Sequence, residues 1–103
     1  MKYLMTWNFR LGGSAAENEQ SIRRGLEVFS KWTPPKGATF HQFLGRVDGT
    51  GGCAVVETDN LSDIADGAAK FGFIADYQVC PVVDIDEATR LLQAAVDFRE
   101  SIP

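Results

Sequence analysis

His41 is the only histidine in the chain. Its unperturbed pKa lies near neutrality, so it is the natural candidate for moving a proton or for ligating a heme iron at a single point. Glu57 is the second candidate, because it follows the apolar residues 53–56 and interrupts their strand. A carboxylate in such a strand would be partly desolvated, with a raised pKa that suits a base. We therefore predict His41 and Glu57 as the catalytic residues of any active site.

Three aromatic residues would line a ligand pocket beside these groups. Trp7, Phe43 and Tyr77 have large apolar rings, and the rings of Trp7 and Tyr77 also carry a polar tip. Ordinary packing in the core or in a dimer interface explains the same residues without a ligand. If the protein has a site, we expect it on the sheet face that bears Glu57, with His41 and the three aromatic residues around it.

Structural roles compete with these assignments. Glu57 could pair with Arg46 or Lys2 on a neighbouring strand, or simply mark the end of its own strand. The facing of His41 depends on strand register: with Val47 opposite Cys53, the side chains of His41, Phe43 and Glu57 share a face. A slip of one residue moves His41 to the other face. The sequence leaves that register open.

The sequence lacks the motifs of several other kinds of functional site. Cys53 and Cys80 are too few for a disulfide framework and lack the paired spacing of a zinc site, so we expect buried free thiols. The glycine-rich residues 49–52 lack the Lys-Ser or Lys-Thr ending of a phosphate-binding loop, and a strand follows them. We predict no cofactor, no structural metal and no covalent catalysis.

The composition restricts the class of protein. The chain has 103 residues, of which 45% are hydrophobic and 23% charged, as expected for one globular domain spanning residues 1–103. The formal charge of -4 has the wrong sign for binding a nucleic acid backbone. No apolar run approaches the ~20 residues that span a bilayer, and the N-terminus lacks the features of a signal peptide. We expect a cytoplasmic protein with neither a nucleic acid nor a membrane as partner.

Hydrophobic periodicity predicts the elements that position the candidate residues. Alternating residues 2–9 predict a strand, and Ser14 with Glu17 predicts a capping box that opens a helix with a buried apolar stripe. Residues 39–47 and 53–58 predict a β-hairpin. Asp59 or Asn60 would cap a second helix. Residues 76–83 predict a fourth strand, and Asp84 or Asp86 would cap a last helix.

This βαββαβ order with a C-terminal helix predicts an α+β ferredoxin-like fold, with an antiparallel four-stranded sheet in the order 4-1-3-2. Pro81 agrees with that order, because proline is tolerated mainly in edge strands. The helices would cover one face of the sheet, yet residues 53–56 and 79–83 are apolar in both phases. A large exposed apolar face is unusual in a monomer, so we expect a homodimer.

Several segments resemble one small bacterial family of domains of unknown function: the Met1-Lys2-Tyr3 start, Leu44-Gly45-Arg46, the glycine-rich turn, Val56-Glu57-Thr58-Asp59 and Pro81-Val82. That family is placed in the dimeric α/β-barrel superfamily, which includes heme-degrading and cofactor-free monooxygenases, lactone isomerases and non-catalytic members. The resemblance implies two sheets packed into a barrel, with a pocket between each sheet and its covering elements.

The predicted function is the binding of a small apolar or aromatic molecule in a pocket beside the sheet. One alternative is a small cofactor-poor enzyme, a monooxygenase or an isomerase like some barrel relatives. The other alternative is a non-catalytic structural or assembly module, in which the aromatic residues serve only packing. Whether any catalysis occurs is left open by the sequence.

Overall fold

A four-stranded antiparallel sheet forms the centre of the computed structural model, which describes all residues 1–103. The strands are β1 (Lys2–Phe9), β2 (Thr39–Gly45), β3 (Gly51–Glu57) and β4 (Ala75–Val82), in the order β2-β3-β1-β4. This is the predicted order read from the other edge, and the ferredoxin-like fold class is confirmed. Pro81 lies in β4, an edge strand, opposite Tyr3.

Three helices accompany the sheet: α1 (Ala15–Lys31), α2 (Leu61–Phe71) and α3 (Ile85–Glu100). The capping box at the start of α1 is confirmed, since the backbone N–H of Glu17 donates to the Ser14 hydroxyl and the N–H of Ser14 donates to the Glu17 carboxylate. Asn60, rather than Asp59, caps α2. None of the helices is long and apolar enough to cross a membrane.

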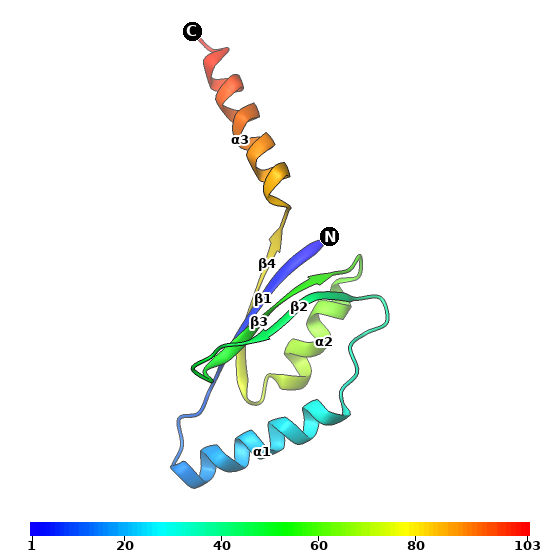
Figure 1. Cartoon of the computed structure of the whole chain (residues 1–103), viewed down its shortest axis with the longest axis vertical. Helices are drawn as coiled ribbons and strands as arrows, with labels where there is room; N and C mark the ends of the chain where they lie inside the picture. Colours follow the sequence, from blue (N-terminus) through cyan, green and yellow to red (C-terminus); the bar gives the residue numbers. More distant parts are fainter.

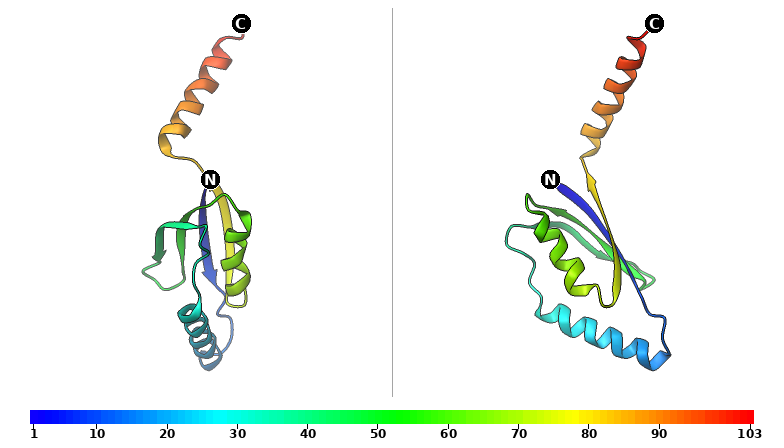
Figure 2. Two further views of the ribbon diagram at one scale, coloured as in Figure 1. Left: turned by 90° about the vertical axis from the view of Figure 1, so that its right-hand side faces the viewer. Right: turned by 180° about the vertical axis from the view of Figure 1, so that it is seen from behind.

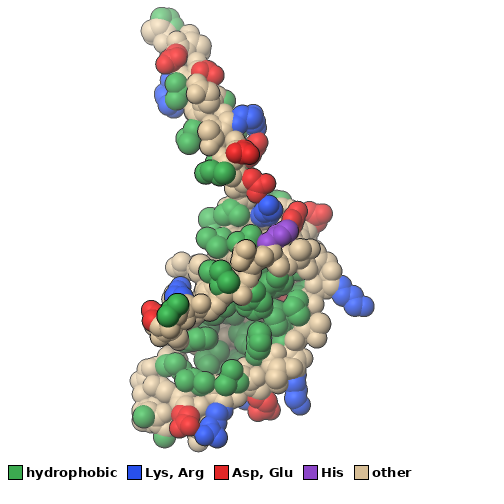
Figure 3. Space-filling view, viewed as in Figure 1, with side chains coloured by type: hydrophobic (Ala, Val, Ile, Leu, Met, Phe, Trp, Pro, Cys, Tyr) green, Lys and Arg blue, Asp and Glu red, His purple; other side chains and the backbone are tan.

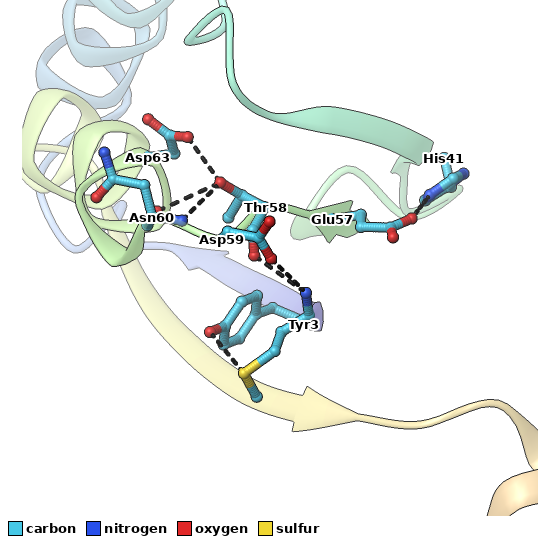
Figure 4. Close-up of polar contacts among 8 residues, drawn as sticks. Tyr3, His41, Glu57, Thr58, Asp59, Asn60 and Asp63 are labelled. Carbon is cyan, nitrogen blue, oxygen red and sulfur yellow. Dashed lines mark hydrogen bonds and ion pairs between the residues drawn. The ribbon is translucent and has the colours of Figure 1, made fainter.

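The turn from β3 into α2 is held by side-chain hydrogen bonds (Figure 4). The Thr58 hydroxyl donates to Asp63 Oδ2 at 2.7 Å and accepts from the N–H of Asn60 at 3.1 Å. Thr58 is buried, so these bonds satisfy a hydroxyl that would otherwise lose its water partners. The turn therefore positions α2 against the sheet.

The helices are arranged unequally around the sheet (Figures 1 and 2). Helix α2 packs along one face, α1 crosses near one end of the sheet, and α3 projects beyond the opposite end. A small core lies beneath α2, formed by Tyr3, Met5, Ala54, Val56 and Ile64. The second face of the sheet carries no helix, and we call it the open face.

A β-bulge decides which face each residue of β2 occupies. Leu44, rather than Val47, lies opposite Cys53, and the register shifts between Phe40 and Gln42. The register with Val47 opposite Cys53, one of those that the sequence leaves open, does not occur, because β2 ends at Gly45 and β3 begins at Gly51, each two residues earlier than expected. The bulge inserts His41 as an extra residue, so Phe40 and Phe43 face the helices while His41 reaches Glu57 on the open face.

Two expectations about burial are also wrong. The apolar stripe of α1 is not buried: Ile22, Leu26 and Phe29 are exposed, because α1 stands away from the sheet. Cys53 is half-buried and Cys80 exposed, because both lie on the open face, where no helix covers them. Both thiols are free, with β1 between their strands.

Candidate functional site

A cavity of about 680 Å³ lies between the sheet and helices α1 and α2. Figure 3 shows hydrophobic side chains gathered around this hollow. Of its 23 lining residues, 16 are hydrophobic, so the cavity offers an apolar surface rather than a polar one. Its volume falls in the range of roughly 300–1,000 Å³ that holds small molecules and cofactors.

The structure brings three predicted site residues together in this cavity. The ring centroids of Trp7 and Phe43 are 5.7 Å apart with an edge-to-face geometry, and those of Trp7 and Tyr77 are 5.8 Å apart. The three residues come from β1, β2 and β4 and line one wall. Such ring arrangements are favourable by about 0.5–1.5 kcal/mol per pair beyond the area that they bury.

Four further aromatic residues, none of them among the predicted site residues, extend this wall. Each has a ring centroid within 6.2 Å of another member of the group, and all four line the cavity: Phe29, Trp32, Phe40 and Phe71. The signal is present in the sequence, because Phe29, Trp32 and Phe71 recur at helical spacing with other apolar residues of the segments 22–32 and 61–71. Such spacing predicts packing in a core, whereas in the structure these side chains form walls of a cavity.

Gly52 allows the indole of Trp7 to lie against β3. A Cβ atom added at Gly52 would stand 2.5 Å from Trp7 Cζ2 and would also collide with the carbonyl oxygen of Leu44. Only glycine leaves space for both groups at this position. The pairing of Gly52 with Trp7 across β1 and β3 therefore fixes the aromatic wall.

A carboxylate just outside the lining, that of Asp66, anchors the indole of Trp32 in the cavity wall. Trp32 Nε1 donates to Asp66 Oδ2 at 3.0 Å, and Lys70 Nζ lies 2.7 Å from Asp66 Oδ1. These two hydrogen bonds, with that of Lys70 the stronger cause, lower the pKa of Asp66. Burial raises the pKa of the half-buried Tyr77 phenol, which keeps that group neutral.

His41 and Glu57 form a hydrogen-bonded pair on the open face, with His41 Nε2 2.7 Å from Glu57 Oε1 (Figure 4). The two side chains are 42% and 48% exposed. The hydrogen bond from His41 lowers the pKa of Glu57, aided by the charges of His41 and Lys2. The predicted raised pKa is therefore wrong, because an exposed carboxylate with a donor beside it is stabilised in its charged form.

The structure separates this pair from the aromatic wall, so the expectation of a single site on one face is wrong. Glu57 lies opposite Lys2 on the open face, whereas Trp7, Phe43 and Tyr77 point to the helices. The bulge at His41 puts Phe43 on the face opposite His41, because it changes the phase of alternation along β2. Glu57 lies on the face opposite Trp7 through ordinary alternation, since it pairs with Lys2, five residues before Trp7 in β1. The alternative partners of Glu57 are engaged elsewhere, as Arg46 donates to Asn8 and Lys2 to Asp84.

Replacing Glu57 by glutamine gives a prediction with a defined pH dependence. Because the pKa of Glu57 is lowered in the folded protein, the ionised carboxylate stabilises the fold at any pH above its ordinary pKa of 4.5. This stabilisation is lost as the pH falls through the lower pKa of the folded state. The unfolding midpoint of Glu57→Gln should therefore lie below that of the unmodified protein at neutral pH and meet it in acid. Glu100→Gln is the control, and a pH-independent difference would contradict the pairing.

Comparison with known proteins agrees with the extent of this domain. No curated protein matches the chain. A family model described as a domain of unknown function, DUF3303, matches residues 1–96, which include every strand, α1, α2 and most of α3. The chain therefore belongs to the DUF3303 family.

Proposed function

We propose that the protein is a homodimer that binds a small apolar or aromatic molecule in the cavity between the sheet and helices α1 and α2. One observation carries this proposal: eight aromatic side chains line a space that the chain's own side chains do not fill. Close-packed interiors leave few voids larger than a water molecule, so a space of this size is a candidate binding site.

The wall favours a predominantly apolar molecule. Only two charged residues line the cavity, and both are hydrogen-bonded within the chain: Asp63 accepts from Thr58, and Arg46 donates to Asn8 and Thr50. Binding would then draw its free energy from buried apolar area, at about 25 cal/mol per Å², and from ring contacts with Trp7 and Tyr77.

The cavity geometry favours binding of a small molecule over its chemical conversion. His41 and Glu57 are the only pair in the chain that joins an imidazole to a carboxylate, and they face away from the cavity. A molecule among the aromatic rings would be on the other side of the sheet from their polar atoms. Proton transfer from this pair to a bound molecule therefore has no geometric support.

The open face supports the dimer. Its apolar side chains include Leu4 and Leu44, which are 37% and 51% exposed, and the half-buried Val55 and Val82. Exposed apolar side chains on one sheet face are typical of a surface that a partner covers. We propose that two open faces pack together, which would give the dimeric α/β barrel that the family resemblance implies.

Gly67 offers a direct test of binding in the cavity. It lies in α2 and lines the cavity, and a Cβ added there would meet no atom within 4 Å. Gly67→Leu should fill part of the cavity, whereas Gly67→Ala should leave most of the space open. Both variants should fold, because removing a glycine from a helix interior stabilises it by about 1 kcal/mol.

The probe for this test is N-phenyl-1-naphthylamine, a neutral aromatic dye that accepts excitation energy from tryptophan. Both tryptophans of the chain, Trp7 and Trp32, line the cavity. We expect saturable tryptophan-sensitised dye emission from the unmodified protein and from Gly67→Ala. Gly67→Leu should bind the dye at least about tenfold more weakly, since the expelled dye loses more than ~1.4 kcal/mol of contacts. Equal binding by all three proteins would contradict a site in this cavity.

A further inference from the structure

Helix α3 has a wide apolar side that its own chain leaves uncovered. Ile85, Leu91, Leu92, Val96 and Phe98 fall within about 160° of the helix circumference. Their exposures lie between 37% and 77%, and α3 has no buried residue. An isolated helix of 16 residues is marginally stable in water, and amphipathic helices persist mainly by packing that apolar side.

The dimensions of the chain show how much surface is left without a partner. The radius of gyration is 18.3 Å, compared with about 13 Å for a compact domain of this length. The accessible surface is 7448 Å², about 1,700 Å² more than expected for a compact monomer of 11.3 kDa. A standard protein interface buries about 800 Å² on each partner, so the excess is sufficient for a stable dimer.

Helix α1 carries a matching uncovered surface. Ile22, Leu26 and Phe29 are 43%, 64% and 50% exposed, although they border the cavity. Helix α1 has 17 residues and α3 has 16, so the two helices have nearly equal lengths of about 25 Å. The apolar side of α3 therefore lacks any cover, and the exposed apolar residues of α1 form a rim of the cavity that a partner helix could cover.

The positions of these helices decide whether they meet within one chain. Helix α3 begins at the end of β4 that is farthest from α1, and it runs away from the sheet (Figures 1 and 2). Only Val83 and Asp84 join it to β4, and Lys2 Nζ holds Asp84 Oδ1 at 2.8 Å. Every hydrogen bond of the helix beyond this point is internal to it. Contact between α3 and α1 of the same chain would require α3 to fold back along the entire sheet.

A two-fold axis perpendicular to the strands brings the helices together without such folding. It reverses the strand direction, so the end of one sheet that carries α3 lies beside the end of the other sheet that carries α1. Two open faces can pack in this orientation, and each α3 then starts at the end of the dimer where the partner's α1 lies, near the rim of the partner's cavity. Such a dimer is isologous, so both copies of α3 gain the same contact.

We infer that α3 of each chain packs on α1 of a second copy and closes the mouth of that copy's cavity. This inference rests on the proposed function, because the partner's α3 would supply the wall that the cavity lacks in a single chain. A ligand in the cavity would then contact apolar residues from two chains. Dissociation of the dimer would open the cavity and weaken binding.

Photo-crosslinking tests the position of α3 in the full-length protein. The benzophenone amino acid p-benzoylphenylalanine replaces Phe98, which is 65% exposed and on the apolar side of α3. Dimers are assembled from chains labelled with nitrogen-14 and nitrogen-15, and the linked peptides are identified by mass spectrometry. We expect links from position 98 to residues 15–31, with both isotopes in one linked product. Links confined to one isotope, or links that avoid α1, would overturn the inference.

A pair of variants tests the effect on the cavity. Leu92→Glu places a charge on the apolar side of α3, and the control Gln93→Glu places it on the polar side. Leu92→Glu should weaken N-phenyl-1-naphthylamine binding about tenfold, as expected from losing one buried leucine contact, while Gln93→Glu binds normally. Unchanged binding by Leu92→Glu would overturn the closure and leave the cavity site intact. Failure of the unmodified protein to bind the dye would refute the proposed function, whereas the crosslinks test the helix contact separately.

Discussion

Replacing Gly52 by alanine should destabilise the protein by about 3 kcal/mol, a large part of the stability of a domain of this size. The added Cβ would collide with the Leu44 carbonyl oxygen on β2 and would stand 2.5 Å from Trp7 Cζ2 on β1. Neither neighbour can move freely, because both strands are paired with β3 on either side. Equilibrium unfolding in urea measures the loss.

Gly45→Ala is the matched control, because Gly45 lies opposite Gly52 in the same hairpin. A Cβ at Gly45 meets no atom within 4 Å, so this variant should retain nearly normal stability. A similar loss in both variants would show that glycine is needed in the hairpin for flexibility, and that the close approach of the indole is not the cause. The Gly52→Ala variant should also show a changed tryptophan emission, since its added methyl displaces the ring of Trp7.

Placing a charge at Leu4 should have the largest effect on association. Leu4 is on the open face, whereas its neighbour Met5 is buried under the helices. In a two-fold dimer, Leu4→Asp introduces one carboxylate from each chain into an apolar contact, and the dissociation constant should rise by about a hundredfold or more. Sedimentation velocity over a concentration series measures the change.

Gln20→Glu is the control for this variant, because it adds the same charge to an exposed position of α1. It lies about 160° around α1 from Ile22 of the apolar stripe, so it should leave the dimer unchanged. Dimers of equal strength in both variants would exclude the open face as the interface. The folded state of Leu4→Asp can be verified by circular dichroism, because this side chain contributes nothing to the core beneath α2.

The sequence predicted the fold well where local signals were strong. The capping box at Ser14, the proline at position 81 and the period of two in residues 2–9 each reflect short-range physical preferences, and each element appears where they indicate. The strand order followed from the sequence of elements, because few arrangements connect βαββαβ without crossing.

The candidate site was harder to predict, because it depends on the bulge in β2 and on the distance of α1 from the sheet. The extra residue at His41 reverses the phase of β2, and nothing in its local sequence indicates a bulge. The stripe of α1 has the spacing of a core helix, and only the three-dimensional structure shows that α1 stands away from the sheet. Trp7, Phe43 and Tyr77 meet as expected. His41 and Glu57 lie on the other face of the sheet.

Native mass spectrometry of the protein purified from its source tests the central claim most directly, because it reports the number of subunits and any bound molecule together. We expect twice the chain mass of 11.3 kDa, with a small apolar molecule retained and released on mild collisional activation. Gly67→Leu should give the same dimer without the retained molecule. A mass of one chain with nothing bound, at micromolar concentration, would contradict both the dimer and the cavity site.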